Sequence, residues 1–218
     1  MTEQSMPPAE PVVPPAHPEP AKRRAARYEG LRSALSTLGI LLLAPIIAIL
    51  LTTFVFQSYQ VDGPSMQTTL FNNDRLIVWK MPRTFARITG HPYIPSRGDI
   101  IVFTDPNIAK FGQDPSKQLI KRVIGLPGDR VVVANGVVNV YNSEHPTGFD
   151  PDFTLPYHRI ARDTLDDVDV TVLPGHVYVM GDNRTDSLDS RLFGQVDAND
   201  IVGKLVVRVL PINSVKRF

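Results

Sequence analysis

Residues 130–140 read Arg-Val-Val-Val-Ala-Asn-Gly-Val-Val-Asn-Val, and this stretch indicates the class of fold. Asn135-Gly136 lies between two Val-rich runs, and a two-residue type I′ turn needs positive φ at both of its positions, which favours Asn-Gly. β-Branched residues such as Val favour strands. The stretch therefore predicts an antiparallel β-hairpin with strands at Arg130–Ala134 and Val137–Val140.

Short apolar runs separated by Gly and Pro continue on both sides of this hairpin. Few segments have helical periodicity, no internal repeat is evident, and residues 82–96 and 141–174 have the composition of irregular stretches. We expect one mostly antiparallel β domain after residue 61. Its further strands are predicted at Arg75–Lys80, Asp99–Phe103, Gln118–Gly125, His176–Met180 and Leu205–Leu210.

A long apolar segment precedes this β-rich region. No residue from Ser33 to Val61 carries a charge, and Leu38 to Phe56 is almost wholly apolar. As a helix this apolar run would cover about 29 Å, close to the hydrocarbon core of a bilayer. A cleaved signal peptide is the alternative, but the run is longer than a usual apolar region of about 7–15 residues, and no Ala-x-Ala site follows it. We predict a retained transmembrane anchor over residues 33–60.

Basic residues gather just before the anchor, and Pro dominates the first twenty residues. By the positive-inside rule the N-terminus would face the cytoplasm, and the chain after Val61 would be exported. We therefore expect a single-pass protein of the plasma membrane. It would have a disordered Pro-rich and basic cytoplasmic tail (1–32), an anchor (33–60) and an extracytoplasmic catalytic domain (61–218). The basic residues are Lys22, Arg23, Arg24, Arg27 and Arg32.

The composition narrows the possible functions. The formal net charge is +1, so the chain lacks the basic excess with which nucleic-acid binders contact phosphates. The sequence has no Cys, which excludes disulfides, thiolate metal sites and a cysteine nucleophile. We expect neither a nucleic-acid partner nor cysteine chemistry.

Ser65 is a candidate nucleophile, because it lies in the turn sequence Gly63-Pro64-Ser65-Met66 shortly after the apolar segment. A serine hydroxyl needs a positioned base to take its proton. None of the five His residues has a recognisable catalytic setting, and Gln67 replaces the last Gly of the Gly-x-Ser-x-Gly nucleophile elbow. A histidine-based triad is therefore not indicated.

Lys121 is a candidate for the base. Strand alternation places it on one face with Leu119 and Val123, and burial on a core-facing strand favours the neutral amine, which can accept a proton. Arg122 would point to the opposite face, either solvated or paired. The alternative is a lysine at a strand edge whose amine reaches water.

Four motifs follow the apolar segment in order and resemble those of bacterial type I signal peptidase, the membrane protease that removes signal peptides from exported proteins. The resemblance covers the anchor to about residue 210 and is to the single-anchor form of Gram-positive and actinobacterial members. It implies a mostly β, signal-peptidase-like domain and a membrane-bound serine endopeptidase that uses a Ser-Lys dyad. The motifs are Gly63-x-Ser65-Met66, the Arg-Gly-Asp-Ile-Ile-Val-Phe of 97–103, the Lys-Arg-Val-Ile-Gly-Leu-Pro-Gly-Asp of 121–129, and the Gly-Asp-Asn-Arg-Thr-Asp-Ser-Leu-Asp-Ser-Arg of 181–191.

The resemblance also implies roles for individual residues. Ser65 would be the nucleophile, with its N–H donating to the oxyanion, and Lys121 the general base. The hydroxyl of Ser187 would hydrogen-bond the lysine amine and orient it. The supporting residues are Asp189 and Arg191, which would form a buried ion pair, and Asp182 and Arg184, which would brace the same loop. Shallow apolar substrate pockets, suited to Ala, carry over onto Val61, Met66, Leu70, Leu119 and Ile120.

Two positions differ from the usual family pattern: Thr68 stands where Pro is common, and Gly63 stands where Gram-negative members place a serine that completes the oxyanion hole.

By resemblance, the partners are exported preproteins and the lipid bilayer, with the secretion translocon as a further candidate. The resemblance implies no metal or organic cofactor. An acidic run at Asp163, Asp166, Asp167 and Asp169 lacks the Gly and terminal Glu of a calcium loop, so we interpret it as solvated.

Two other classes of function remain open at this point. One is a self-cleaving repressor-type Ser-Lys protease of related fold, against which the anchor and the absence of a DNA-binding module argue. The other is a catalytically silent β module that is tethered to the membrane and binds partners. Loss of Ser65 would separate catalysis from binding, because binding should survive it.

Overall fold

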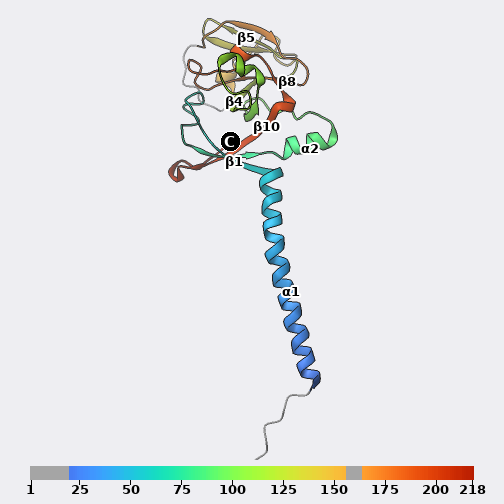
Figure 1. The fold of residues 1–218 in the computed structure, drawn as a ribbon. Helices are drawn as coiled ribbons and strands as arrows, with labels where there is room; N and C mark the ends of the chain where they lie inside the picture. Colours follow the sequence, from blue (N-terminus) through green and yellow to red (C-terminus); the bar gives the residue numbers. More distant parts are fainter. Residues whose placement is uncertain (1–19, 156–163) are drawn as a thin grey trace, which may run out of the picture. The chain divides into compact units, whose positions relative to one another are not determined.

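The computed structural model describes residues 20–155 and 164–218, with side chains described from residue 35 onward. The chain divides into two compact units, Met1–Ala48 and Ile49–Phe218. Figure 1 shows an N-terminal helix and a β-rich second unit. The mostly antiparallel β architecture predicted from the sequence is confirmed.

The N-terminal helix α1 (Pro20–Leu50) continues into a π-helical turn, η1 (Leu51–Val55). Residues 35–55 have a mean hydropathy of 2.7 and are long and apolar enough to cross a membrane. Their apolar side chains are exposed, with Ile40 and Leu41 at 68% each. A helix of this length and composition is suited to lipid.

The boundaries of the tail and the anchor differ from the prediction. Residues 20–32, expected in a disordered tail, form the first turns of α1, since they contain no Pro after residue 20 and are rich in the helix formers Ala and Arg. Residues 56–60, expected at the end of the anchor, form strand β1, in which more and less exposed side chains alternate and the backbone pairs with β2. The expectation for residues 1–19 lies outside the described residues.

The bounds of the remaining elements, in chain order, are as follows. The strands are β1 (Phe56–Gln60), β2 (Arg75–Trp79), β3 (Ile100–Thr104), β4 (Gln118–Gly125), β5 (Arg130–Ala134), β6 (Val137–Tyr141), β7 (Val168–Thr171), β8 (His176–Met180), β9 (Val196–Asp197), β10 (Ile201–Leu210) and β11 (Lys216–Arg217). The helices are α2 (Met81–Thr89), α3 (Pro151–Thr154) and α4 (Ser190–Phe193), and the short 3₁₀ turns are η2 (Pro106–Phe111), η3 (Ala198–Asp200) and η4 (Ile212–Ser214).

The larger sheet has the strand order β1-β2-β10-β3-β4-β8-β9, with β11 paired to β10, and its neighbouring strands are antiparallel. In β3 the residues from Ile100 to Phe103 are all buried, as expected of a central strand covered on both faces. β4 lies next to β3, with Lys121 opposite Ile101. The sheet therefore places Lys121 deep in the second unit.

The smaller sheet has the order β6-β5-β7 and contains the predicted hairpin. Ala134 pairs with Val137, so the loop is the two residues Asn135 and Gly136, whose φ angles are +51° and +79°. The hairpin prediction is confirmed. The alternate valines Val131, Val133, Val138 and Val140 are buried together in one core cluster.

The other predicted strands are confirmed with small shifts, except that β10 begins four residues earlier than expected, at Ile201. The stretch 82–96 was wrongly expected to be irregular, because its first half is helix α2. Pro82 lies in the first turn of that helix, where its missing N–H costs no hydrogen bond. The strands β7, β9 and β11 were also not predicted; they are short, and β7 alternates Val with polar residues inside an otherwise irregular stretch.

Candidate active site

Ser65 lies in the turn that follows β1, and the turn is fixed by main-chain hydrogen bonds. The N–H of Gly63 donates to Asn72 Oδ1 at 3.1 Å, and the φ of Gly63 is +104°, a conformation that favours glycine. The N–H of Gln67 donates to Pro64 O at 3.0 Å. The carbonyl of Ser65 accepts from the N–H of Asn183 at 3.0 Å. The nucleophile candidate is therefore attached directly to the 181–191 loop.

Lys121 lies within hydrogen-bond distance of this serine. Its Nζ is 2.8 Å from Ser65 Oγ and donates to Ile120 O at 3.0 Å. The side chain is 3% exposed, so the alternative of a lysine that reaches water is wrong. Burial lowers the pKa of Lys121 to about 8, although the nearby Asp189 carboxylate opposes this shift.

A cavity of about 270 Å³ opens beside the two side chains. Of the predicted pocket residues, Val61, Leu119 and Ile120 line it together with Ser65 and Lys121. Its further lining includes Tyr59, Pro64, Leu76, Val102 and Leu188. The hydroxyl and the amine are thus next to a small, largely apolar hollow.

Met66 and Leu70 were predicted as pocket residues but do not line this cavity. They are 1% and 0% exposed and pack in a core cluster with Leu76, Ile100 and Leu205. The Leu70 N–H donates to Met66 O at 2.8 Å, so the chain coils after Ser65 and turns these side chains inward. Met66 and Leu70 therefore fix the Ser65 turn to the core.

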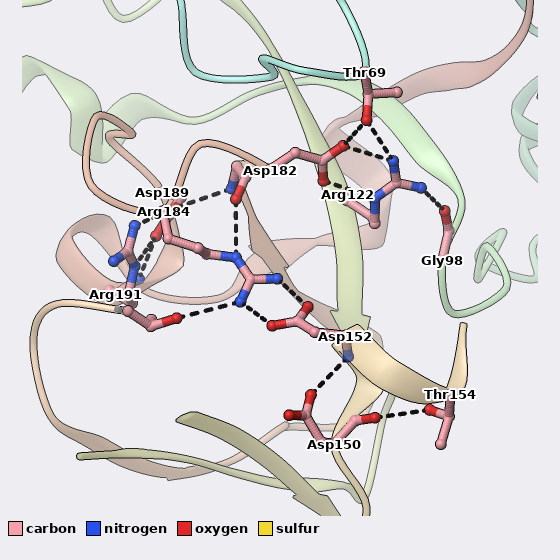
Figure 2. Close-up of polar contacts among 12 residues, drawn as sticks. Thr69, Gly98, Arg122, Asp150, Asp152, Thr154, Asp182, Arg184, Asp189 and Arg191 are labelled. Carbon is pink, nitrogen blue, oxygen red and sulfur yellow. Dashed lines mark hydrogen bonds and ion pairs between the residues drawn. The ribbon is translucent and has the colours of Figure 1, made fainter. Parts of the chain in front are cut away.

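Arg122 connects three segments of the site (Figure 2). Its Nε and Nη2 donate to Asp182 at 2.7 and 2.6 Å, and its Nη1 donates to Gly98 O at 2.7 Å. Thr69, four residues after Ser65, donates to the same Asp182 carboxylate at 2.5 Å. Strand β4, the Ser65 turn and the 181–191 loop therefore meet at one buried ion pair, and Arg122 is paired, not solvated.

Three further charged residues of the 181–191 loop, Arg184, Asp189 and Arg191, are also paired (Figure 2). Arg184 forms a fully buried bidentate pair with Asp152 of α3, at 2.6 and 2.5 Å. Asp189 and Arg191 form the predicted buried ion pair at 2.8 Å, and Asp189 also accepts from the Gly181 N–H at 3.0 Å. Breaking a buried pair by removing one partner typically costs about 3–5 kcal/mol, so these pairs fix the loop.

Ser187 does not make the predicted hydrogen bond to the lysine amine. Its Oγ is buried and has no hydrogen-bond partner among the described residues. The Lys121 amine instead contacts Ser65 Oγ and Ile120 O. The Ser187 hydroxyl lies against Gly181, where a Cβ would clash with it and would come within 2.5 Å of Ser65 O.

Sequence reasoning assigned no role to four residues that fix the loop: its partners Thr69, Arg122 and Asp152, and Gly181 within it. Gly181 and Arg122 stand inside quoted motifs, so the motifs themselves were a signal for them. Asp152 lies in a stretch expected to be irregular, and nothing in its local pattern identifies Arg184 as its partner. Such pairings depend on the folded topology.

No group of three or more His, Cys, Asp or Glu side chains could hold a metal ion within residues 35–155 and 164–218. In the acidic run, Asp169 pairs with Arg130 at 2.5 Å on the surface. Asp163 lies outside the described residues. Among the described residues, the acidic run therefore forms no group of side chains that could bind a metal ion.

Gly181→Ala tests how tightly the loop packs on the nucleophile's backbone. The added Cβ must displace Ser187 Oγ or the Ser65 carbonyl. We expect a stability loss of about 1–3 kcal/mol and, because the reacting hydroxyl shifts, a drop in kcat/KM of about 10²-fold. Gly203→Ala is the matched control, since its Cβ would come within 2.5 Å of Trp79 O, away from the site. Thermal unfolding and peptide cleavage of both variants are measured; equal loss of activity in the two would contradict the expectation.

Comparisons with known proteins identify the family. Residues 34–210 match the family described as "Signal peptidase, peptidase S26". The signal peptidase I of Leptolyngbya laminosa is 36% identical over 208 residues, 93% of this chain and 90% of that protein. The signal peptidase I of Bacillus caldolyticus is 37% identical over 170 residues, 74% of this chain and 83% of that protein. The probable signal peptidase I-1 of Synechocystis is 36% identical over 173 residues, 79% of this chain and 80% of that protein. The chain therefore belongs to the signal peptidase I family, peptidase S26, and is a serine endopeptidase.

Proposed function

We propose that this chain is a membrane-bound endopeptidase that removes N-terminal signal peptides from exported preproteins by a dyad of Ser65 and Lys121. The observation that carries the proposal is the 2.8 Å distance between Lys121 Nζ and Ser65 Oγ, in a setting where burial lowers the lysine pKa to about 8. A lysine with this pKa is partly neutral near neutral pH and has a lone pair for the serine proton.

In the first half of the reaction the Ser65 hydroxyl donates its proton to the neutral Lys121 amine and attacks the scissile carbonyl. An ester forms between Ser65 and the signal peptide. The protonated amine then gives its proton to the leaving amine of the mature protein. In the second half water gives a proton to the neutral lysine and attacks the ester carbonyl. The lysine returns this proton to Ser65 Oγ as the C–O bond breaks, which releases the signal peptide as a carboxylic acid and restores Ser65.

The negative charge on the carbonyl oxygen needs hydrogen-bond donors. The Ser65 N–H is the first candidate, because among the described residues it makes no hydrogen bond. The N–H of Gly63 already donates to Asn72 and is not oriented for this task. Each donor to an oxyanion typically contributes about 2.7–4 kcal/mol to the transition state.

The cavity supports a preference for small apolar side chains next to the cut. Val61, Leu119 and Ile120 supply apolar lining beside the dyad, and the volume of about 270 Å³ is smaller than that of a typical ligand site. Ala at the positions one and three before the scissile bond would fit such a hollow. A bulky side chain would not fit a hollow of this volume.

The supporting residues act through the dyad. Two ion pairs keep the 181–191 loop in place against the Ser65 turn. They join Asp182 to Arg122 and Arg184 to Asp152. Asp189 and Arg191 brace the end of the same loop beside Gly181. We assign Ser187 to the lysine end of the site: its hydroxyl is buried without a hydrogen-bond partner among the described residues, and this role requires it to bond to the Lys121 amine when substrate is bound.

Anchoring suits a substrate that is itself tethered to the membrane by its signal sequence. Confinement of enzyme and substrate to one surface raises their effective concentration. In this proposal residues 35–55 span the bilayer, the N-terminus is cytoplasmic, and the catalytic domain lies outside the cytoplasm in the plasma membrane. The preprotein and the lipid are the partners, and the secretion translocon remains a candidate.

Cleavage of a model preprotein by the purified full-length chain in detergent tests the proposed function. The expected product is the mature protein, cut after an Ala-x-Ala sequence, with no added metal. A chain that cleaves only itself would instead support the repressor-type alternative. A chain that binds the preprotein without cutting it, with the same affinity after Ser65→Ala, would support the silent module.

The orientation is tested by proteolysis of intact protoplasts that produce the full chain. Because the basic residues precede the span and Asp62 follows it, we expect external protease to digest the chain after Val61 and to leave the tail protected. Antibodies against each end follow the fragments. Digestion of the tail alone would show the opposite orientation. It would also contradict the proposed function, because the catalytic domain would then lie on the wrong side of the membrane to cut signal peptides.

A further inference from the structure

Helix α2, labelled in Figure 1, presents an apolar stripe to solvent. Met81, Phe85 and Ile88, at spacings i, i+4 and i+7, lie on one face and are 37%, 64% and 79% exposed. Arg83 and Arg87 lie on the opposite face of the same helix. A helix with this division of apolar and basic side chains is typical of the membrane interface.

Hydrogen bonds connect α2 to the end of the candidate membrane span. The N–H of Lys80, just before the helix, donates to Val55 O at 2.8 Å, and its Nζ donates to Thr52 O at 3.3 Å. The Thr84 hydroxyl donates to Phe54 O at 3.2 Å. Residues 52–55 are the last turn of the span, so α2 lies within about one helix diameter of the point where the chain leaves the bilayer.

Two exposed aromatic residues extend this surface. Phe56 and Trp79 pair across β1 and β2 and are 42% and 39% exposed. Trp and other aromatic rings are favoured at the level of the lipid headgroups. We call the five residues Phe56, Trp79, Met81, Phe85 and Ile88 the interfacial patch.

We propose that α2 is an interfacial helix, whose apolar stripe inserts into the headgroup–acyl boundary of the same bilayer that the anchor spans. The inference rests on the proposed membrane anchor, because the span sets the depth of α2. Arg87, which is exposed, then lies toward water and lipid phosphates, while the half-buried Arg83 faces the domain near Asp200.

This contact gives the catalytic unit a second attachment to the membrane. A single span leaves a domain free to rotate and tilt about its exit point. A helix that inserts beside that point restricts this motion and keeps one side of the unit against the lipid. α2 also contacts β10 of the main sheet, so the restriction is transmitted to the sheet that carries Lys121.

The occupant we commit to is lipid, because the stripe is continuous with the end of a membrane span. A second copy of the chain, or the apolar segment of a substrate, would bury the same stripe without placing it in lipid. A depth measurement separates these cases. The chain has no Cys, so single substitutions introduce unique labelling positions.

The experiment uses four variants of the full chain: Phe85→Cys, Ile88→Cys, Ile46→Cys and Phe153→Cys. Each is labelled with the fluorophore NBD and reconstituted into vesicles of phosphatidylethanolamine and phosphatidylglycerol. Ile46 lies in the middle of the span and reports the anchor. Phe153 is the matched control, an 82% exposed Phe on α3, which packs on β6 of the smaller sheet. Quenching by lipids that carry nitroxides at shallow and deep positions is compared with quenching by aqueous iodide.

We expect the shallow lipid nitroxide to quench the labels at positions 85 and 88 several-fold more than the label at 153, which iodide should quench best. The label at 46 should respond to the deep nitroxide. If positions 85 and 88 behave like 153, the inference is wrong and the anchor stands. Protection of both positions from lipid and iodide alike would mean that protein covers the stripe, and this also overturns the inference. If position 46 fails to respond to lipid quenchers, the proposed anchor and the inference both fall.

Discussion

Ser65→Ala is expected to lower the rate of signal-peptide cleavage by about 10⁶-fold, the scale seen when a serine protease loses its nucleophile. No other hydroxyl is in hydrogen-bond contact with the Lys121 amine among the described residues. The lysine keeps its bond to Ile120 O, so the fold should be unaffected. Single-turnover cleavage of a model preprotein measures the loss, and thermal unfolding of the same sample checks the fold.

Ser187→Ala is the matched control for this prediction, since it removes a second buried serine hydroxyl next to the site. An orienting role predicts a partial defect of about 10²–10⁴-fold. Because Ser187 Oγ has no hydrogen-bond partner among the described residues, its removal should leave thermal stability unchanged. Full activity of Ser187→Ala would remove its role, while residual cleavage by Ser65→Ala near the wild-type rate would remove the dyad itself.

Much of the fold could be predicted where local pattern and tertiary structure agree. The hairpin at 130–140 is one case, because its turn chemistry and its Val alternation each specify the same pairing. Strand β4 is another, since its bounds follow from an apolar run that ends at Gly125. The strand pattern also favoured a core-facing Lys121, but its 3% exposure in the structure was needed to exclude an amine that reaches water.

The rest required the folded chain. Met66 and Leu70 follow the nucleophile directly, yet the turn that exposes Ser65 coils inward after it and buries them. Their burial could not be predicted from the sequence, because the direction of each side chain depends on hydrogen bonds within the turn. Strand β1 was hidden for another reason: its first residue continues the apolar run of the span, and only pairing with β2 separates the two.

The buried ion pairs form a third class. Arg122 is adjacent to Lys121 in sequence, but its partner Asp182 comes from a loop that β8 brings alongside β4. Arg184 pairs with Asp152, which lies in the single turn of helix α3. A charge in a motif indicates that a partner exists, because an unpaired buried charge is costly. The identity of that partner is a property of the topology.

Lys121→Met is the second variant with a large expected effect. Met fills a similar volume and has no proton acceptor of comparable strength, so Ser65 loses its base and cleavage should fall by about 10⁴-fold or more. Lys110→Met, at an exposed lysine on η2, is the control and should cleave normally.

In the wild type, the rate of cleavage should rise with pH as Lys121 loses its proton near pH 8 and should then level off. A rise centred near the ordinary lysine value of about 10.4 would show that the amine is not desolvated in the working enzyme.

The same variant tests the lysine through stability. The pKa of Lys121 is about 8 in the folded chain and returns to its ordinary value of 10.5 on unfolding. Between these values the unfolded chain binds more protons, so the contribution of Lys121 to stability increases as pH rises from 8 to 10.5. Below pH 8 burial of the amine costs about 3 kcal/mol, at 1.36 kcal/mol per pKa unit. Lys121→Met lacks this dependence. We therefore expect the free energy of unfolding of the wild type, measured relative to Lys121→Met in detergent, to increase by about 3 kcal/mol across that window. A constant difference between the two proteins from pH 7 to 10.5 would mean that the lysine has an ordinary pKa and that another group takes the serine proton.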